Sequence, residues 1–278
     1  MKARTRKGQL RHPLLWVAAF LVVGLLIPSG PASATSITFT GSSGSLAASA
    51  IFDVSGTTLK VTLNNTSSAD VLVPADVLTA VFFTIAGNPT LSKTSAFLSA
   101  GSTVLFPTPS GSGASLCVAG AAACAGPNVG GEWAYKSGLS QYGANEGISS
   151  SGFSGATSFG AGDRFPGSNL QNPVAPDGIQ YGITSTGDNP TTGNAAVTGK
   201  NGLIQHAVDF TLGGFTGSLS DISNVTFQYG TALTEPHFGG NCTSGCNPVP
   251  EPASLLLLGS GLVGLGLWGW KRREDVRA

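Results

Sequence analysis

Apolar residues recur at every second position in the first part of the chain that follows residue 35. Residues 49–54 and 58–64 both alternate between apolar and polar side chains, a period that is typical of strands with one buried face. Ser55 and Gly56 lie between the two segments and predict a two-residue hairpin turn. The alternation returns at residues 77–85, and residues 95–106 favour a further strand.

The pattern changes between residues 107 and 200, where Gly, Ser, Ala, Asn and Pro dominate. A disordered linker is poor in aromatic residues, yet seven are spaced through this part: Trp133, Tyr135, Tyr142, Phe153, Phe159, Phe165 and Tyr181. We therefore expect long ordered loops with a few short strands, laid over the sheet. The alternative is a flexible insertion.

Strand-like alternation resumes between residues 203 and 230. One face is predicted to carry Ile204, Val208, Phe210 and Leu212, and another Val225, Phe227 and Tyr229. Many short strands with turns between them and hardly any helix predict a mainly β fold, an antiparallel β-sandwich of jelly-roll type with long Gly-, Ser- and Asn-rich loops. The domain is expected over residues 35–233, followed by a turn-rich stalk at 234–248.

The N-terminus has the three parts of a secretory signal peptide. Residues 2–11 hold five basic side chains and no acid, residues 14–27 are apolar, and Ala32-Ser33-Ala34 supplies small residues at the two positions that signal peptidase reads. We expect residues 1–34 to be removed after Ala34. The alternative is an anchor that is retained, but the apolar run is short for a full membrane span.

A second apolar segment, residues 253–270, contains no ionisable side chain. As a helix it would rise about 27 Å, close to the hydrocarbon thickness of a bilayer. The basic residues Lys271, Arg272 and Arg273 follow directly, and such a cluster resists translocation and stays cytoplasmic. The sequence therefore predicts a transmembrane helix at 253–270 with a basic tail at 271–278.

Pro250, Glu251 and Pro252 precede this segment. Each proline fixes its φ and disfavours helix at the residue before it, so the tripeptide should be extended. The order of Pro-Glu-Pro, apolar segment and basic cluster resembles the PEP-CTERM sorting signal of Gram-negative bacteria, from residue 249 to 278. The resemblance implies processing by exosortase, a transpeptidase-like enzyme of the inner membrane. It covers sorting only and implies nothing about residues 35–248.

Charge limits the partners of the exported part. Between residues 35 and 249 there are eleven acidic and five basic side chains, a net charge of −6. Nucleic-acid binding requires a basic surface, so we expect no nucleic-acid partner. The expected partners are signal peptidase, an exosortase-like enzyme and, transiently, the inner membrane, with exopolysaccharide as a further candidate.

Four cysteines lie in the exported part, where an oxidising compartment favours disulfides. Three pairings are possible, and we favour the local pairs Cys117–Cys124 and Cys242–Cys246 because each closes a short loop. The alternative is a metal site. Six residues separate Cys117 from Cys124, and no histidine is near either pair, so we expect neither metal nor cofactor.

Catalytic constellations are weak. His206 is predicted on an apolar strand face, His237 in the stalk, and Asp209 on the opposite strand face from His206, where it cannot orient that ring. We therefore expect a non-enzymatic protein of the cell surface or extracellular matrix. The alternatives are a carbohydrate-binding module, with Trp133, Tyr135 and Tyr142 as stacking residues, and a secreted hydrolase.

Overall fold

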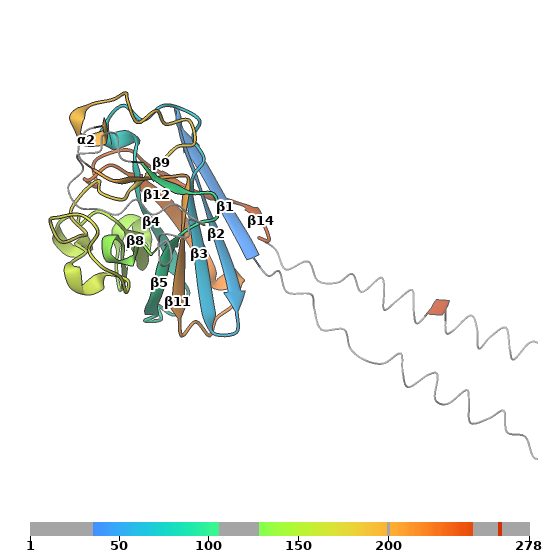
Figure 1. Ribbon diagram of the computed structural model, residues 1–278. Helices are drawn as coiled ribbons and strands as arrows, with labels where there is room; N and C mark the ends of the chain where they lie inside the picture. Colours follow the sequence, from blue (N-terminus) through green and yellow to red (C-terminus); the bar gives the residue numbers. More distant parts are fainter. Residues whose placement is uncertain (1–35, 106–127, 199–200, 247–260, 263–278) are drawn as a thin grey trace, which may run out of the picture. The chain divides into compact units, whose positions relative to one another are not determined.

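Two β-sheets face each other across one hydrophobic core (Figure 1). The computed structural model describes residues 36–105, 128–198, 201–246 and 261–262. Phe52 of one sheet lies against Phe83 of the other, with ring centroids 5.1 Å apart and an edge-to-face geometry. The predicted mainly β fold is therefore confirmed.

The first sheet has six strands in the order β14-β1-β2-β3-β11-β5, and all its pairs are antiparallel. Its strands are β1 (Ser36–Ser43), β2 (Leu46–Ser55), β3 (Thr58–Asn65), β5 (Ser92–Leu98), β11 (Ala207–Gly213) and β14 (Asn241–Ser244). The predicted hairpin joins β2 to β3. Its turn residues are Gly56 and Thr57, one position later than expected, and Gly56 has φ +59°, which only glycine adopts readily.

The second sheet has eight strands and divides at β4 (Leu78–Ile85). One path runs β13-β12-β4-β9-β10-β6, while β8 also pairs with β4 and carries β7. The other strands are β6 (Thr103–Leu105), β7 (Ala134–Ser137), β8 (Glu146–Ser149), β9 (Ile183–Thr184), β10 (Leu203–Gln205), β12 (Ile222–Tyr229) and β13 (His237–Gly239). The β9–β10 pair is parallel, so this sheet is mixed.

Between residues 36 and 246, the helical structure of the described residues consists of single turns: η1 (Pro74–Asp76), η2 (Gly130–Glu132), η3 (Gln141–Gly143), η4 (Gly155–Thr157), η5 (Ala161–Asp163), η6 (Leu219–Asp221) and α2 (Ala195–Thr198). Gly261 and Leu262 are also helical. No helix in these ranges has the length and apolar character needed to cross a membrane. The predicted transmembrane segment 253–270, apart from Gly261 and Leu262, and the predicted signal peptide lie outside the described residues.

Strand β4 is buried on both faces, although a period of two predicts only one. Val81 and Phe83 belong to the core between the sheets, whereas Ala80 and Phe82 belong to a second cluster with Leu139 and other residues of the 134–159 segment. That segment therefore covers the outer face of the sheet. In the 134–159 segment the loops around β7 and β8 lie over the sheet as predicted. For the rest of residues 107–200 this arrangement stays a prediction, and residues 106–127 and 199–200 are outside the described ranges.

The predicted strand that contains Ile204 and Val208 is divided between the two sheets. Ile204 pairs with β6 and β9 of the eight-stranded sheet, while Val208 lies in β11 of the six-stranded sheet. His206 lies at the crossing with φ +100°, a conformation that non-glycine residues rarely adopt. The four apolar residues therefore do not share one strand face as predicted, because the chain changes sheet at His206.

The stalk expected at 234–248 is largely part of the domain. Strand β13 pairs with β12, and β14 pairs with β1, so residues 237–244 extend both sheets. These strands are only three and four residues long, and their local pattern is too short to predict a strand. Three sequential strands, β1 to β3, form a meander, and the jelly-roll connectivity stays a prediction.

Candidate functional site

The folded domain begins and ends on neighbouring strands, β1 and β14 (Figure 1). The register places Thr38 opposite Ser244 and Phe39 opposite Cys242 in an antiparallel ladder. The hydroxyl of Thr243 also donates a hydrogen bond to the Thr38 carbonyl, at 3.3 Å. The chain therefore enters and leaves the domain at the same edge of the six-stranded sheet.

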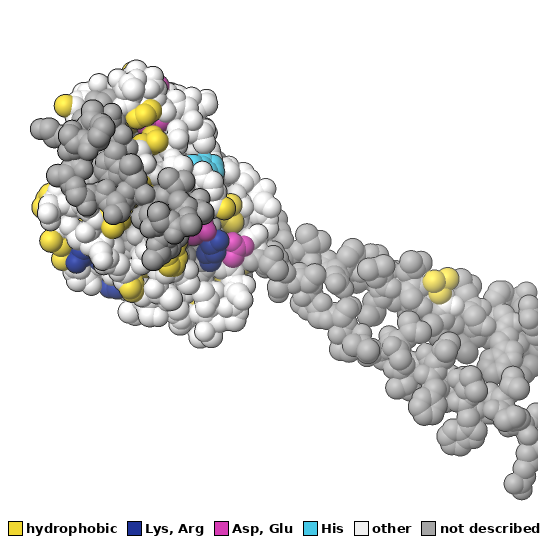
Figure 2. Space-filling model, viewed as in Figure 1, with side chains coloured by type: hydrophobic (Ala, Val, Ile, Leu, Met, Phe, Trp, Pro, Cys, Tyr) yellow, Lys and Arg dark blue, Asp and Glu magenta, His cyan; other side chains and the backbone are white. Residues whose placement is uncertain are grey.

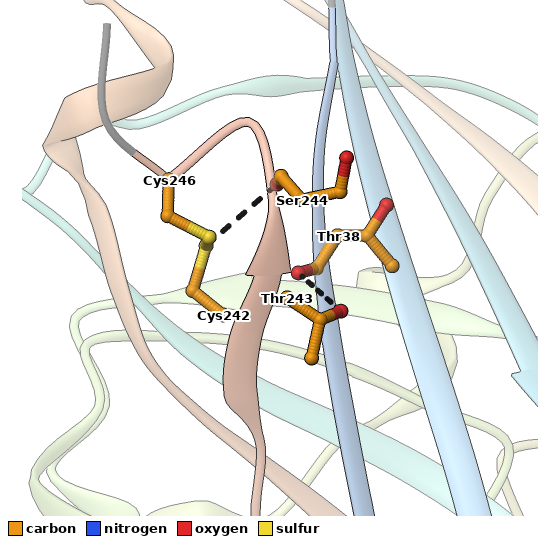
Figure 3. Close-up of a disulfide and its surroundings, with 5 residues drawn as sticks. All are labelled: Thr38, Cys242, Thr243, Ser244 and Cys246. Carbon is orange, nitrogen blue, oxygen red and sulfur yellow. Dashed lines mark hydrogen bonds between the residues drawn. A yellow bond between two sulfur atoms is a disulfide. The ribbon is translucent and has the colours of Figure 1, made fainter. Parts of the chain in front are cut away.

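A disulfide joins Cys242, within β14, to Cys246, two residues after the strand ends (Figure 3). The Cα atoms of the two cysteines are 5.8 Å apart, within the ordinary range for a disulfide. This local pair confirms one of the two predicted disulfides. The other predicted pair, Cys117–Cys124, lies outside the described residues.

Gly245 brings the disulfide loop against the start of β1. It has φ +71°, and a Cβ atom at this position would lie 2.1 Å from the Ser36 carbonyl oxygen. Any other residue would therefore clash with backbone and adopt a strained conformation. Only Asn247, Pro248 and Val249 separate Cys246 from Pro250 in the sequence, so the domain ends close to the Pro-Glu-Pro tripeptide.

Replacing both Cys242 and Cys246 with serine should lower the free energy of unfolding by about 2 kcal/mol, because the short loop then gains freedom in the unfolded chain. Chemical denaturation of the oxidised proteins measures this difference. Thr243→Ser keeps the hydroxyl of the same strand and should stay close to the wild type. A doubly substituted protein as stable as the wild type would contradict this role of the disulfide.

Glu132 is a fully buried acid at the end of η2. Its Oε1 accepts hydrogen bonds from the backbone N–H groups of Leu170 and Gln171, the latter at 3.2 Å, while Oε2 has no hydrogen-bond partner among the described residues. Burial raises the pKa of Glu132 to about 7, against the opposing effect of the two N–H donors. The carboxyl group thereby holds the loop that follows Ser168 against η2.

Glu146 of β8 is a second fully buried acid. The hydroxyl of Tyr135 on the adjacent strand β7 donates to its Oε2 at 2.6 Å, and Oε1 has no partner in the described part of the chain. Burial raises the pKa of this carboxyl to about 7. The Tyr135–Glu146 bond therefore fastens β7 to β8 inside the protein.

The two buried acids do not form a catalytic pair. The charges that act on Glu132 are those of Asp177 and Arg164, whereas the polar neighbour of Glu146 is Tyr135. Each side chain is inaccessible to a substrate in this structure. A pair of carboxylates that divides acid and base roles must both reach the reacting atoms, so these residues fit a structural role.

The aromatic residues expected to stack on glycans do not form an exposed platform. Trp133 is 0% exposed, packs on Phe210 with ring centroids 5.0 Å apart, and donates its indole N–H to the Tyr181 carbonyl at 3.0 Å. Tyr135 is buried as well. Both residues stabilise the core, and the prediction that they stack on sugars is corrected, because their faces are covered by protein.

Tyr142 is half-buried, and its own contacts already use its ring and hydroxyl. Its ring is stacked on His237 at 4.4 Å, and its hydroxyl bonds to Gln228 Oε1 at 2.5 Å and to the Leu233 carbonyl at 2.9 Å. His237 lies on strand β13 and not in a stalk loop. This contact joins η3 to β13.

His206 and Asp209 do not combine into a catalytic group. Asp209 forms an ion pair with Lys60 at 2.9 Å and accepts hydrogen bonds from Thr62 and Ser99. Burial alone would raise the pKa of Asp209. The hydrogen bonds and the charge of Lys60 together outweigh burial, so the pKa lies below its ordinary value. His206 Nδ1 is shielded and has no hydrogen-bond partner in the described ranges, so this ring lacks the orienting acid that a general base needs.

Charged side chains are sparse on the face that Figure 2 shows. Among the described residues, no group of three or more His, Cys, Asp or Glu side chains could hold a metal ion. The pattern of the sequence did not predict that Glu132 and Glu146 are buried. Their only sequence signal is an acid within a segment rich in small and aromatic residues.

Comparison with protein families identifies the C-terminal segment. Residues 248–273 match the PEP-CTERM protein-sorting motif, which contains the predicted Pro250, Glu251 and Pro252 and the basic residues Lys271, Arg272 and Arg273. These residues, and Ala32 and Ala34 of the predicted cleavage site, lie outside the described residues. Comparison with curated proteins and with solved structures finds no match.

Proposed function

Because the chain carries a PEP-CTERM protein-sorting motif at residues 248–273, we propose that it is a cell-surface or extracellular-matrix protein that acts without catalysis. Signal peptidase removes residues 1–34, and the tail holds the precursor in the inner membrane. An exosortase-like enzyme then processes the tail and releases the domain to the envelope. The observation that carries this proposal is the sorting motif itself.

The described domain has properties that suit this destination. A disulfide next to the sorting motif is typical of a protein that matures in an oxidising compartment. The first and last strands pair with each other, so the termini of the domain are fixed within the six-stranded sheet. A domain of this kind tolerates removal of both flanking segments, because its core is built from residues 36–246.

Two features of the domain support a non-catalytic role. The buried acids Glu132 and Glu146 contact protein groups and lie apart from solvent, and Nδ1 of His206 has no hydrogen-bond partner in the part of the chain that the structure describes. A secreted hydrolase would need an accessible nucleophile or acid–base pair. Exopolysaccharide is the partner that we propose for the released domain.

The Pro-Glu-Pro tripeptide provides the test. Glu251→Ala should cause an unprocessed precursor to accumulate in the inner membrane of cells that contain an exosortase, because the processing enzyme loses the one carboxylate between the two prolines. Cell fractionation and immunoblotting of the domain measure the ratio of precursor to released protein.

Glu274→Ala is the matched control, since it removes one carboxylate from the same tail beyond the motif. This variant should be processed like the wild type. Normal release of the Glu251→Ala protein would show that the tripeptide is not recognised, and the proposed processing route would then fail.

A further inference from the structure

An open pocket of about 620 Å³ lies between three loops that are far apart in the sequence. Its walls are residues 151–154, 176–178 and 231–234. None of these residues belongs to the sorting motif, and neither Glu132 nor Glu146 lines the pocket. The pocket is a separate feature of the domain, although the charge of its lining residue Asp177 acts on Glu132.

Hydrogen bonds hold the walls of the pocket in place. The carboxylate of Glu235 accepts bonds from the backbone N–H groups of Thr231 and Ala232, both at 2.6 Å. Gln228 donates to the Ala232 carbonyl at 3.1 Å, and Ser151 Oγ donates to the Thr231 carbonyl at 3.4 Å. A site whose loops are fixed before binding loses little conformational entropy when a ligand enters.

One wall supplies an aromatic ring. Phe153 is half-buried, and its ring packs against Phe82 and Phe159 with centroid distances of 6.0 and 6.3 Å. Its backbone has φ +46°, a conformation that is uncommon for an aromatic residue. The aromatic cluster fixes the orientation of this ring, and Phe153 is one of the residues that line the pocket.

A second wall contains a partly exposed acid, Asp177. Its Oδ1 is shielded from solvent and has no hydrogen-bond partner among the described residues. Burial raises the pKa of Asp177 above its ordinary value. The lining also includes the hydroxyl groups of Ser154 and Thr234, and its described residues include neither lysine nor arginine.

We propose that this pocket binds a neutral saccharide of one or two sugar rings. The Phe153 ring offers a flat apolar surface for the C–H face of a pyranose, and Asp177 accepts hydrogen bonds from its hydroxyl groups. A phosphorylated or carboxylated ligand fits poorly, because the described lining residues include an acid and no cation to balance it. This binding is independent of the sorting route, so the two proposals fail separately.

Ligand-observed NMR and calorimetry on the full-length protein test the proposal. The protein is held in a detergent without a sugar headgroup, and the probes are glucose, galactose, mannose, N-acetylglucosamine and the disaccharides of each. At least one probe should bind with a Kd of about 1 mM, typical of a small, solvent-open site. Asp177→Asn and Phe153→Leu should each weaken that binding at least tenfold.

Matched variants separate binding from folding. Phe153→Tyr keeps the aromatic face and should retain binding, while Asp53→Asn removes a charge from β2, outside the pocket, and should leave the Kd unchanged. The proposal is overturned if no saccharide in the panel binds, or if Asp177→Asn binds as tightly as the wild type. Binding of spermidine in place of every saccharide would equally overturn it, since the pocket would then be a cation site.

Discussion

Raising the pH from about 5 to about 8 should lower the free energy of unfolding by roughly 4 kcal/mol, because Glu132 and Glu146 must ionise inside the protein. Both carboxyl groups are fully buried, and burial raises the pKa of each from 4.5 to about 7. In the unfolded chain both groups have the ordinary pKa of 4.5, so they are already largely ionised at about pH 5.

The sign follows from the protons that each state holds. Between pH 4.5 and about 7 the folded protein keeps protons on these acids that the unfolded chain has released, so stability falls as pH rises. The contribution is complete below the unfolded pKa and is lost as pH passes the folded pKa. Each pKa unit corresponds to about 1.4 kcal/mol, and partial relaxation around each carboxylate reduces the total.

Chemical denaturation at a series of pH values and constant ionic strength measures this dependence. Glu132→Gln and Glu146→Gln together should flatten it, because an amide keeps the acceptor oxygen and does not titrate. Asp53→Asn, which removes an acid from β2, is the control and should leave the slope unchanged. A wild-type protein whose stability stays constant or increases over this range would contradict the assignment.

The local pattern of the sequence was sufficient for features that depend on neighbouring residues. The β2–β3 hairpin follows from two alternating segments with a glycine between them, and the Cys242–Cys246 disulfide follows from a short spacing. The sorting motif is also local, since its tripeptide, apolar segment and basic cluster follow each other directly. In each case the interacting residues are close in the chain.

Features that depend on distant residues were not predictable in this way. The outer face of β4 is buried because the 134–159 segment covers it, and β14 is a strand because β1 supplies its partner. The sequence around His206 did not indicate that the chain passes from one sheet to the other at this residue. The pocket joins three loops from residues 151 to 234, so no single window of sequence contains it.

The aromatic residues illustrate the same limit. Trp133 and Tyr135 were candidates for stacking on sugar rings under the alternative of a carbohydrate-binding module, while core packing was the favoured use of at least some of these aromatic residues. Trp133 instead contacts Phe210 of the other sheet, and Tyr135 bonds to Glu146. Sequence alone gives the aromatic content of a segment, but the direction of each ring depends on which strand lies opposite.

Phe52→Ala should lower the free energy of unfolding by about 4 kcal/mol, the second large effect that we expect. Phe52 is fully buried at the centre of β2, with Phe39 beside it at 5.9 Å and Phe83 of the opposite sheet at 5.1 Å. Truncation removes this contact between the two sheets, one of several, and leaves a cavity that rigid strands cannot close.

Thermal and chemical denaturation of the variant measure this loss, with two comparisons. Phe52→Leu retains most of the buried volume and should cost less than Phe52→Ala. Phe97→Ala removes the same ring from strand β5, where the side chain is 37% exposed, and should cost about 1 kcal/mol or less. If Phe52→Ala and Phe97→Ala proved equally mild, Phe52 would not lie between the sheets. The arrangement of the two sheets around one core would then be wrong, because that arrangement requires the ring to be surrounded on both sides.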